Sequence, residues 1–497
     1  MVKSVKINIL FVYLSSFLPA ILTFVFWIIA ANYTNPTTIG IIASITSFSM
    51  VLGVLSNFDV PIGMKRFIGK AFANEEFLQI KQIISVSSIF LIFTSIGILI
   101  VALNPFFDIL SLTNIEKKFI PIIITIVIGN SIRHVFTQSL ISILKSKLIF
   151  FPAIISSVAR FPLFFGLLAI SFDPIMNVAI SYSIFYLLSS SILTIIVIYE
   201  MKKLNVSFNL EFKKTLKFVI HASFLRWIPQ ILSVIGSQLG ILAVFAMKGA
   251  ADAGLFYIPF AIYNVMFLVI GSITQVSHPV LSGISDESKQ EQFLQKSLKF
   301  GFLISMPLVA IAFFYVKEII SVFGNSFIPS SEVMNILLLS FPLAIITELV
   351  FYLFYARGEY KRVLFLGLFG NVPRILLYYL LIPIYGINGS AFAFIAGTGI
   401  QLVLTIILIK KSKLKLKYMD YFLISIIPFS IAFAFEFINL GLIGIPVIVL
   451  LSILTYIRSG MLQKQELFEI LKIFFNEEKS NAITEKLVHK LKKIYLM

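Results

Sequence analysis

Long apolar segments, separated by short polar connections, recur along the whole chain. Each is about 20 residues or longer, the length that an α-helix needs to cross a bilayer, and turn residues or charges mark its ends. The pattern therefore predicts an all-α polytopic membrane protein with about 14 transmembrane helices. The predicted spans are 9–31, 38–58, 82–104, 117–143, 146–171, 175–199, 216–247, 253–282, 297–321, 331–355, 361–383, 387–410, 418–437 and 440–458.

Composition supports the membrane interpretation and excludes several classes of function. Hydrophobic residues make up 59% of the 497 positions and charged residues only 13%, and the polar connections are too short to form extramembrane domains. The chain has no cysteine and only four histidines, so disulfides, cysteine-ligated zinc and a histidine-rich metal site are not expected. The sequence contains no phosphate-binding P-loop, so we predict neither an intrinsic ATPase nor a cofactor.

Basic residues are distributed very unevenly between the two predicted faces of the membrane. Of the 40 Lys and Arg residues, 32 fall on one set of alternate loops together with both termini, and the other face carries only Lys117, Lys118, Lys248 and Lys317. The net charge of +17 would suggest nucleic acid for a soluble protein, but here the positive-inside rule explains it. We predict a multi-pass protein of the cell membrane with both termini in the cytoplasm and no nucleic-acid partner.

The two halves of the chain resemble each other. Val158-Ala159-Arg160 reappears as Val372-Pro373-Arg374, and the same offset of 214 positions places Lys147 on Lys361 and Gly40 on Gly254. Repeats of this kind build transporters from two similar lobes. We therefore expect two six-helix lobes related by an internal repeat, plus two extra C-terminal helices. The expected domains are 1–208, 209–412, 413–459 and a cytoplasmic amphipathic tail at 460–497, either on the inner leaflet or solvated.

Polar residues follow one side of several predicted spans. Ser223, Arg226, Gln230, Ser233 and Ser237 are spaced by three or four positions, which places them on one face of a helix. Lipid cannot satisfy such a stripe, so it must face protein or water. The same rule selects three further sets, which are Asn130, Arg133, His134, Thr137 and Gln138; Tyr257, Asn264, Gln275 and His278; and Asn371, Arg374 and Tyr378.

Four arginines lie inside predicted spans, where a charge is costly. These are Arg133, Arg160, Arg226 and Arg374. One interpretation places them around a central cavity that binds an anion, because the planar guanidinium donates two parallel hydrogen bonds to phosphate. The alternative is that each arginine ties helices together through backbone carbonyls or a carboxylate.

Glu348 is the carboxylate placed deepest in a predicted span, and it is a candidate site for a coupling proton or cation. His134 is a second candidate, because an imidazole titrates near neutral pH. For both residues the alternative is a structural role, through an ion pair or a hydrogen bond between helices. Gly236 and Gly240 have the small-xxx-small spacing that lets membrane helices approach closely. Asp59-Val60-Pro61 is interpreted as a cytoplasmic helix break.

Several short motifs occur in an order typical of one family. They are Thr34 to Gly40, Ala253 to Tyr257, Phe323-Gly324, Ala356 to Glu359, and Ile382 to Ala391. With these motifs the chain resembles the polysaccharide-unit (Wzx-like) flippases of the multidrug/oligosaccharidyl-lipid/polysaccharide (MOP) exporter superfamily. The resemblance implies a MATE-like fold and alternating-access movement of a lipid-linked pyrophosphate oligosaccharide from the cytoplasmic to the outer leaflet.

The same resemblance implies a polyprenyl-linked oligosaccharide and membrane lipids as partners, with glycan-assembly enzymes as further candidates. In that setting the four arginines and His278 are substrate-binding candidates, and Gln230, Asn264 and Gln275 are placed to meet sugar hydroxyls. Two rival functions are a multidrug/cation antiporter on the same fold and a membrane glycosyltransferase or polymerase. The antiporter needs carboxylates in its cavity, and the enzyme needs a sizeable extracytoplasmic loop with acid/base residues. The sugar, the coupling ion and the oligomeric state are not specified by the sequence.

Overall fold

The computed structural model describes residues 2–104, 113–203, 211–438 and 444–463, with Glu466 and Phe468. All regular structure in these residues is helical. The first half of the chain contains α1 (Val2–Tyr33), α2 (Pro36–Asn57), α3 (Val60–Ala73), α4 (Phe77–Leu103), the 3-10 helix η1 (Lys117–Phe119), α6 (Ile120–Ser142), α7 (Lys147–Val158), α8 (Arg160–Ala169) and α9 (Pro174–Lys203).

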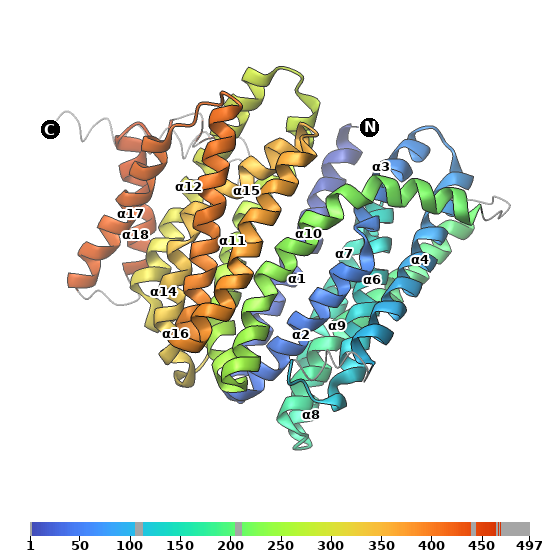
Figure 1. The fold of residues 1–497 in the computed structure, drawn as a ribbon, viewed down its shortest axis with the longest axis horizontal. Coiled ribbons are helices and arrows are strands. Elements are labelled where there is room, and N and C mark those ends of the chain that lie inside the picture. The colour runs from blue at the N-terminus through green and yellow to red at the C-terminus, as the bar shows by residue number, and fades with distance from the viewer. Residues whose placement is uncertain are drawn as a thin grey trace.

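The second half begins with the long helix α10. It contains α10 (Phe212–Lys248), α11 (Ala250–Gly283), α12 (Glu287–Phe314), α13 (Val316–Ser321), the 3-10 helix η2 (Asn325–Ser330), α14 (Ser331–Leu339), α15 (Phe341–Ala356), α16 (Tyr360–Lys411), α17 (Tyr418–Ile438) and α18 (Gly444–Arg458). Figure 1 shows α3, α4, α6, α7 and α9 on one side of the molecule and α12 and α14 to α18 on the other, with α10 passing between them.

The predicted spans correspond closely to these helices. Among the described residues, 11 helices are long and apolar enough to cross a membrane, and the bent pair 325–339 and 341–356 adds one more. Helix α16 has 52 residues, or about 78 Å at 1.5 Å per residue, more than twice the thickness of the hydrocarbon core. Its backbone is not helical at Gly386, with φ 58° and ψ −135°, so α16 consists of two spans. With the shorter α18, the set is compatible with 14 spans.

Local sequence explains where α2 and α11 begin. Asn35 caps α2 by accepting a hydrogen bond from the Thr38 backbone N–H at 2.9 Å, and Pro36 occupies the first turn, where its missing N–H costs nothing. Gly249 takes the corresponding place before α11 with a positive φ of 97°, which glycine tolerates. Because these two breaks are 214 positions apart, they fit the internal repeat inferred from the sequence.

The helix break at Asp59 is confirmed, but it is followed by a helix that the sequence pattern did not indicate. Helix α3 begins at Val60 and buries Val60, Met64 and Ile68 against neighbouring helices. Its other side carries Lys65 and Arg66, which are exposed. With only 14 residues and an amphipathic pattern, α3 lacks the continuous apolar run by which the other helices are recognised. The predicted tail at 460–497 lies almost entirely outside the described residues.

Candidate substrate cavity

A large cavity lies within the first half of the molecule and reaches α10. Its volume is about 700 Å³, within the range of ligand-binding cavities. We call it the basic cavity, because Lys65, Arg133 and Arg226 line it, and among its described lining residues there is no carboxylate. Its other polar lining residues are Asn8, Tyr13, Ser15, Ser16, His134, Thr137, Gln138, Ser146 and Ser189.

Helix α6 supplies polar atoms to this cavity that have no protein partner. One nitrogen of Arg133 donates to Asn130 Oδ1 at 3.0 Å, and its guanidinium lies 5.5 Å from the centre of the Phe185 ring. Arg133 Nε, Thr137 Oγ1 and Gln138 Oε1 are buried and make no hydrogen bond to the described residues. A buried polar atom without a partner is costly, so these groups would gain a hydrogen bond if a small movement of their side chains brought them to water or to a polar ligand in the cavity.

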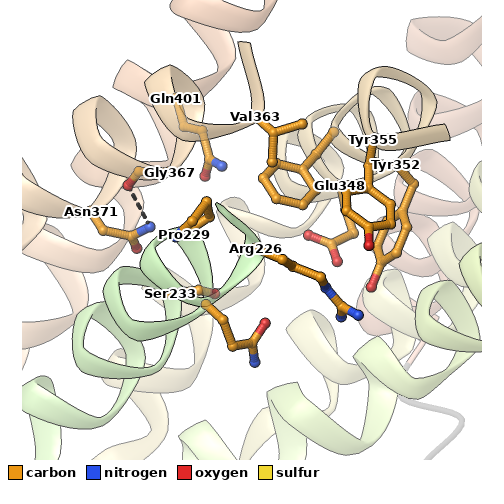
Figure 2. Close-up of a pocket in the computed structure, with 12 residues that line it drawn as sticks. Arg226, Pro229, Ser233, Glu348, Tyr352, Tyr355, Val363, Gly367, Asn371 and Gln401 are labelled. Carbon is orange, nitrogen blue, oxygen red and sulfur yellow. Dashed lines mark hydrogen bonds between the residues drawn. The ribbon is translucent and has the colours of Figure 1, made fainter. Parts of the chain in front are cut away.

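A smaller pocket lies on the other side of Arg226, with a volume of about 80 Å³. Figure 2 shows Arg226 reaching from α10 toward the wall that carries Glu348, Tyr352 and Tyr355. Gln230, Ser233, Asn371 and Gln401 complete the polar lining of this Glu348 pocket. No salt bridge to Glu348 is found among the described residues, so its carboxylate has no arginine or lysine as a direct ion-pair partner there.

Arg226 lines both spaces and is ion-paired with a residue from the first half of the chain. Its Nε lies 3.2 Å from Asp59 Oδ2, and its guanidinium lies 5.2 Å from the centre of the Tyr355 ring. Asp59 sits between α2 and α3 and is only 6% exposed. Burial raises the pKa of the Asp59 carboxyl to about 6, although Arg226 opposes this shift.

Arg160 and Arg374, the repeat-related pair, are both buried inside their own halves, at 1% and 7% exposure. Arg160 donates to Thr23 Oγ1 at 2.7 Å and lies over the rings of Tyr182 and Phe185. Arg374 donates to Asn371 Oδ1 at 3.2 Å and to Thr398 Oγ1 at 3.0 Å, and lies over Phe394. Both side chains are enclosed by protein, and neither lines the basic cavity or the Glu348 pocket. Their role in substrate binding stays a prediction.

The structure thus brings together some of the candidate residues and separates others. Arg133, His134 and Arg226 line the basic cavity, and Gln230 and Glu348 line the smaller pocket. Asn264 is exposed on α11. The side chains of Gln275 and His278 lie outside the described part of the structure.

Four lining or neighbouring residues were not among the candidate site residues: Asp59, Lys65, Tyr352 and Tyr355. Asp59 and Lys65 belong to the corner around α3, where the sequence pattern predicted a cytoplasmic helix break. That pattern did not indicate which side chains face a cavity. Tyr352 lies four positions after Glu348, and Tyr355 lies three after Tyr352, so this spacing was an available signal for a shared helix face.

Comparison with known families and relatives agrees with this architecture. Residues 147–332 match the profile of the family described as "Polysaccharide biosynthesis protein". A protein of Shigella flexneri described as "Putative O-antigen transporter" is 24% identical over 182 residues, which are 36% of this chain. The matched region spans 44% of that relative's length.

Solved structures share the fold over most of the chain. An inward-facing multidrug resistance MATE family transporter of the MOP superfamily has a TM-score of 0.64 at 12% identity, covering 82% of this chain and 98% of that one. The lipid II flippase MurJ, in an inward closed conformation, has a TM-score of 0.60 at 17% identity, covering 91% of this chain and all of that one. The chain therefore shares the fold of these solved transporters, and its residues 147–332 resemble a polysaccharide biosynthesis family.

Proposed function

We propose that this chain, an all-helical membrane protein of the MOP superfamily fold with a polysaccharide-biosynthesis family match, is a flippase for a lipid-linked oligosaccharide. The headgroup, a pyrophosphate with its sugars, enters the basic cavity from the cytoplasmic leaflet while the polyprenyl tail stays in the bilayer. Movement of the two lobes against each other then exposes the headgroup to the opposite side. The product serves the assembly of a cell-surface polysaccharide or glycan.

The observation that carries this proposal is the charge of the cavity. Lys65, Arg133 and Arg226 line a space of about 700 Å³ whose described lining has no carboxylate. Such a cavity favours an anion and disfavours a cationic drug, because low-dielectric walls strengthen the field of its charges. This separates the flippase from the multidrug/cation antiporter, which needs acidic groups where its substrate binds.

Within this proposal the residues divide by chemistry. Arg133 and Arg226 hold the phosphates, since their guanidinium groups match phosphate oxygens in geometry and charge. Gln230, Asn264 and Gln275 meet sugar hydroxyls, and His278 is a further substrate-binding candidate. Arg160 and Arg374 approach the path of the headgroup as the lobes move, and Glu348 and His134 are the candidates for ion coupling. The amide and hydroxyl lining of the basic cavity, including Thr137 and Gln138, suits a sugar in the same way.

The orientation follows from the charge distribution. The basic loops and both termini face the cytoplasm, and α3 with Lys65 and Arg66 lies on that side. Helices at 1–208 form the first lobe and those at 209–412 the second, and the two C-terminal spans at 413–459 are an addition. Partners of the protein are the lipid-linked substrate, membrane lipids and the enzymes that build or use the glycan.

Depletion of the protein in its native cell tests this function without knowledge of the sugar. We expect a lipid-linked oligosaccharide to accumulate with its sugars facing the cytoplasm, where an impermeant sugar oxidant added outside does not reach them. Normal movement of all lipid-linked sugars to the outer leaflet after depletion would contradict the proposal. A membrane glycosyltransferase would instead cause a shorter glycan to accumulate.

A further inference from the structure

The first half of α10 packs against the opposite half of the molecule. The rings of Phe67 and Phe218 lie 3.9 Å apart between their centres, and those of Phe58 and Trp227 stack at 4.2 Å. Trp227 Nε1 also donates to the Val54 carbonyl at 2.8 Å. These contacts join α10 to the end of α2 and to α3, which Figure 1 shows at the same end of the molecule.

From Pro229 onward, α10 makes close contacts with α16. A Cβ placed on Gly367 would lie 3.3 Å from Pro229, and one on Gly236 would lie 3.0 Å from Asn371 Cβ. Tyr378 donates to the Gly236 carbonyl at 3.0 Å. All three contacts are with α16, in the second half of the chain. Pro229 cannot donate the backbone hydrogen bond of a normal helix position, so a change of direction is least costly there.

The ion pair between Asp59 and Arg226 lies just before Pro229, in the part of α10 that contacts the end of α2 and α3. It is the charged contact that joins the corner between α2 and α3 to α10, with Nε and Oδ2 3.2 Å apart. Phe58 and Asp59 both have positive φ, at 48° and 54°, a conformation that non-glycine residues keep only where the surroundings support it. Arg226 at the same time lines the basic cavity beside Lys65. The Arg226 guanidinium can therefore contact either the Asp59 carboxylate or an anion bound in that cavity.

We propose that the Asp59–Arg226 ion pair is a latch that holds the first half of α10 on the corner between α2 and α3, and that an anionic headgroup in the basic cavity releases it by taking over Arg226. The release half of this inference rests on the proposed function. Asp59 is then a positioning residue, which makes no contact with the substrate and acts through Arg226.

The Asp59 carboxylate and the anionic headgroup compete for Arg226, and this competition determines whether the latch is closed or open. A pyrophosphate offers Arg226 two charged oxygens in the fork geometry that guanidinium prefers, and Lys65 and Arg133 attract the same ligand. Asp59 makes a single ion-pair contact with Arg226, so exchange of partners is favourable once the ligand is present. A ligand shifts a conformational equilibrium only if it binds one state better. The empty protein keeps the latch closed, and the loaded protein opens it, which couples movement of α10 to substrate.

The absence of cysteine in the natural chain allows a direct test by disulfide trapping. A Cβ on Gly63 would lie 3.1 Å from Ser223 Cβ, close to the separation that a disulfide spans, so Gly63→Cys with Ser223→Cys reports the latched state. Gly236→Cys with Asn371→Cys, beyond Pro229, is the matched control. In membranes treated with copper phenanthroline, adding Asp59→Asn should slow cross-linking of the first pair by about fivefold or more and leave the second unchanged. An unchanged rate of the first pair would overturn the latch.

Reversing the charges separates the latch from folding defects. Asp59→Arg with Arg226→Asp restores an ion pair of opposite polarity, so the rate of the first cysteine pair should return toward its original value. A rate that stays low, in a protein whose control pair still cross-links, would show that the ion pair is not what holds α10. Asp252→Asn, in the first turn of α11, is the control for removal of an acidic charge, and it should change neither rate.

The release step is tested with farnesyl pyrophosphate, and farnesol serves as the uncharged control. With Asp59 and Arg226 intact, the pyrophosphate should slow cross-linking of 63 with 223 by about fivefold, and farnesol should not. Equilibrium dialysis measures binding separately. Binding without a change in rate would overturn the release. Absence of binding would contradict both the pyrophosphate headgroup of the proposed function and the release of the latch by that headgroup. The cross-linking rate of the Asp59→Asn variant would still test whether the ion pair holds α10.

Discussion

Gly40 and Gly254 lie against each other where α2 crosses α11, although they occupy equivalent positions of the internal repeat. A Cβ on Gly40 would lie 1.8 Å from the Ala250 carbonyl oxygen, and a Cβ on Gly254 would lie 1.9 Å from the Pro36 carbonyl oxygen. Pro36 and Ala250 are also 214 positions apart. Such a reciprocal contact is the mark of two similar units related by a two-fold axis that passes close by.

Alanine at either glycine should therefore force α2 and α11 apart. Backbone atoms, which cannot move away as a side-chain tip can, occupy the space of the new methyl group. We expect Gly40→Ala and Gly254→Ala each to cost about 1–3 kcal/mol of stability, as overpacking of a tight contact does. Thermal unfolding in detergent measures this. Gly97→Ala and Gly166→Ala are matched controls, because nothing lies within 4 Å of a Cβ at these positions, and a loss of stability as large in the controls would refute the explanation.

Replacement of Arg226 tests whether a guanidinium in the basic cavity is required. A hydrogen bond to a charged group contributes about 1.5–3 kcal/mol, so Arg226→Gln should weaken substrate binding about 10- to 100-fold. Arg226→Lys should rescue export only in part, because an ammonium lacks the planar fork. A complementation assay of glycan export measures both.

The control must account for Asp59, which Arg226→Gln leaves buried without its partner. Arg226→Gln combined with Asp59→Asn removes that uncompensated charge and should restore protein yield without restoring export. Full export by the double variant would reject the role of Arg226 in substrate binding.

Glu348 has two possible roles that the same substitution separates. If its carboxylate binds a coupling ion, Glu348→Gln should remove the pH or cation dependence of flipping in proteoliposomes at normal protein yield. If it is structural, the change should lower the yield and leave that dependence intact. Since no salt bridge to Glu348 occurs in the described residues and it lines a small polar pocket, we expect the first result. Unaltered ion dependence at reduced yield would contradict this expectation.

The raised pKa of Asp59 predicts a pH dependence of the ion pair with Arg226. The carboxyl has a pKa of about 6 in the folded protein and 3.8 ordinarily, so between these values the folded state holds the extra proton. The contribution of Asp59 to stability therefore falls as pH rises through this window, whereas the ion pair forms only as the carboxyl ionises. Lower pH slows every cysteine pair because the thiolate is the reactive form, so the rate of 63 with 223 is compared with that of the control pair, 236 with 371. Lowering pH from 7.5 to 5 should slow the first pair more than the control pair. Asp59→Asn should abolish this excess, and an excess that persists in that variant would assign it to another group.

Most of the fold was predictable because membrane helices carry a strong signal. An apolar run of about 20 residues admits few other structures, since lipid satisfies no backbone hydrogen bond. The break at Asn35-Pro36 follows from such a local pattern, and the observed helices are compatible with the 14 predicted spans. The repeat that pairs Gly40 with Gly254 is visible in the sequence as matching residues at a constant offset. Helix α3 was missed because an amphipathic helix of 14 residues has no such run.

The site was less accessible to sequence reasoning, because a polar stripe shows that a residue avoids lipid but not which protein group it meets. Arg133, Arg160, Arg226 and Arg374 look alike in the sequence. In the structure Arg226 is ion-paired and lines two spaces, whereas Arg160 and Arg374 are packed over aromatic rings. The pairing of Asp59 with Arg226 joins residues 167 positions apart, a relationship that only the packing of α10 on α3 creates.

The most direct test of the central claim uses the lipid-linked oligosaccharide that accumulates in cells depleted of the protein. The purified lipid and the purified protein are reconstituted into vesicles, and an impermeant oxidant reports which sugars face outward over time. We predict that sugars move between leaflets with the intact protein, and that Arg133→Gln combined with Arg226→Gln slows this movement to the rate of empty vesicles. Equal rates in vesicles with and without the intact protein would contradict the account.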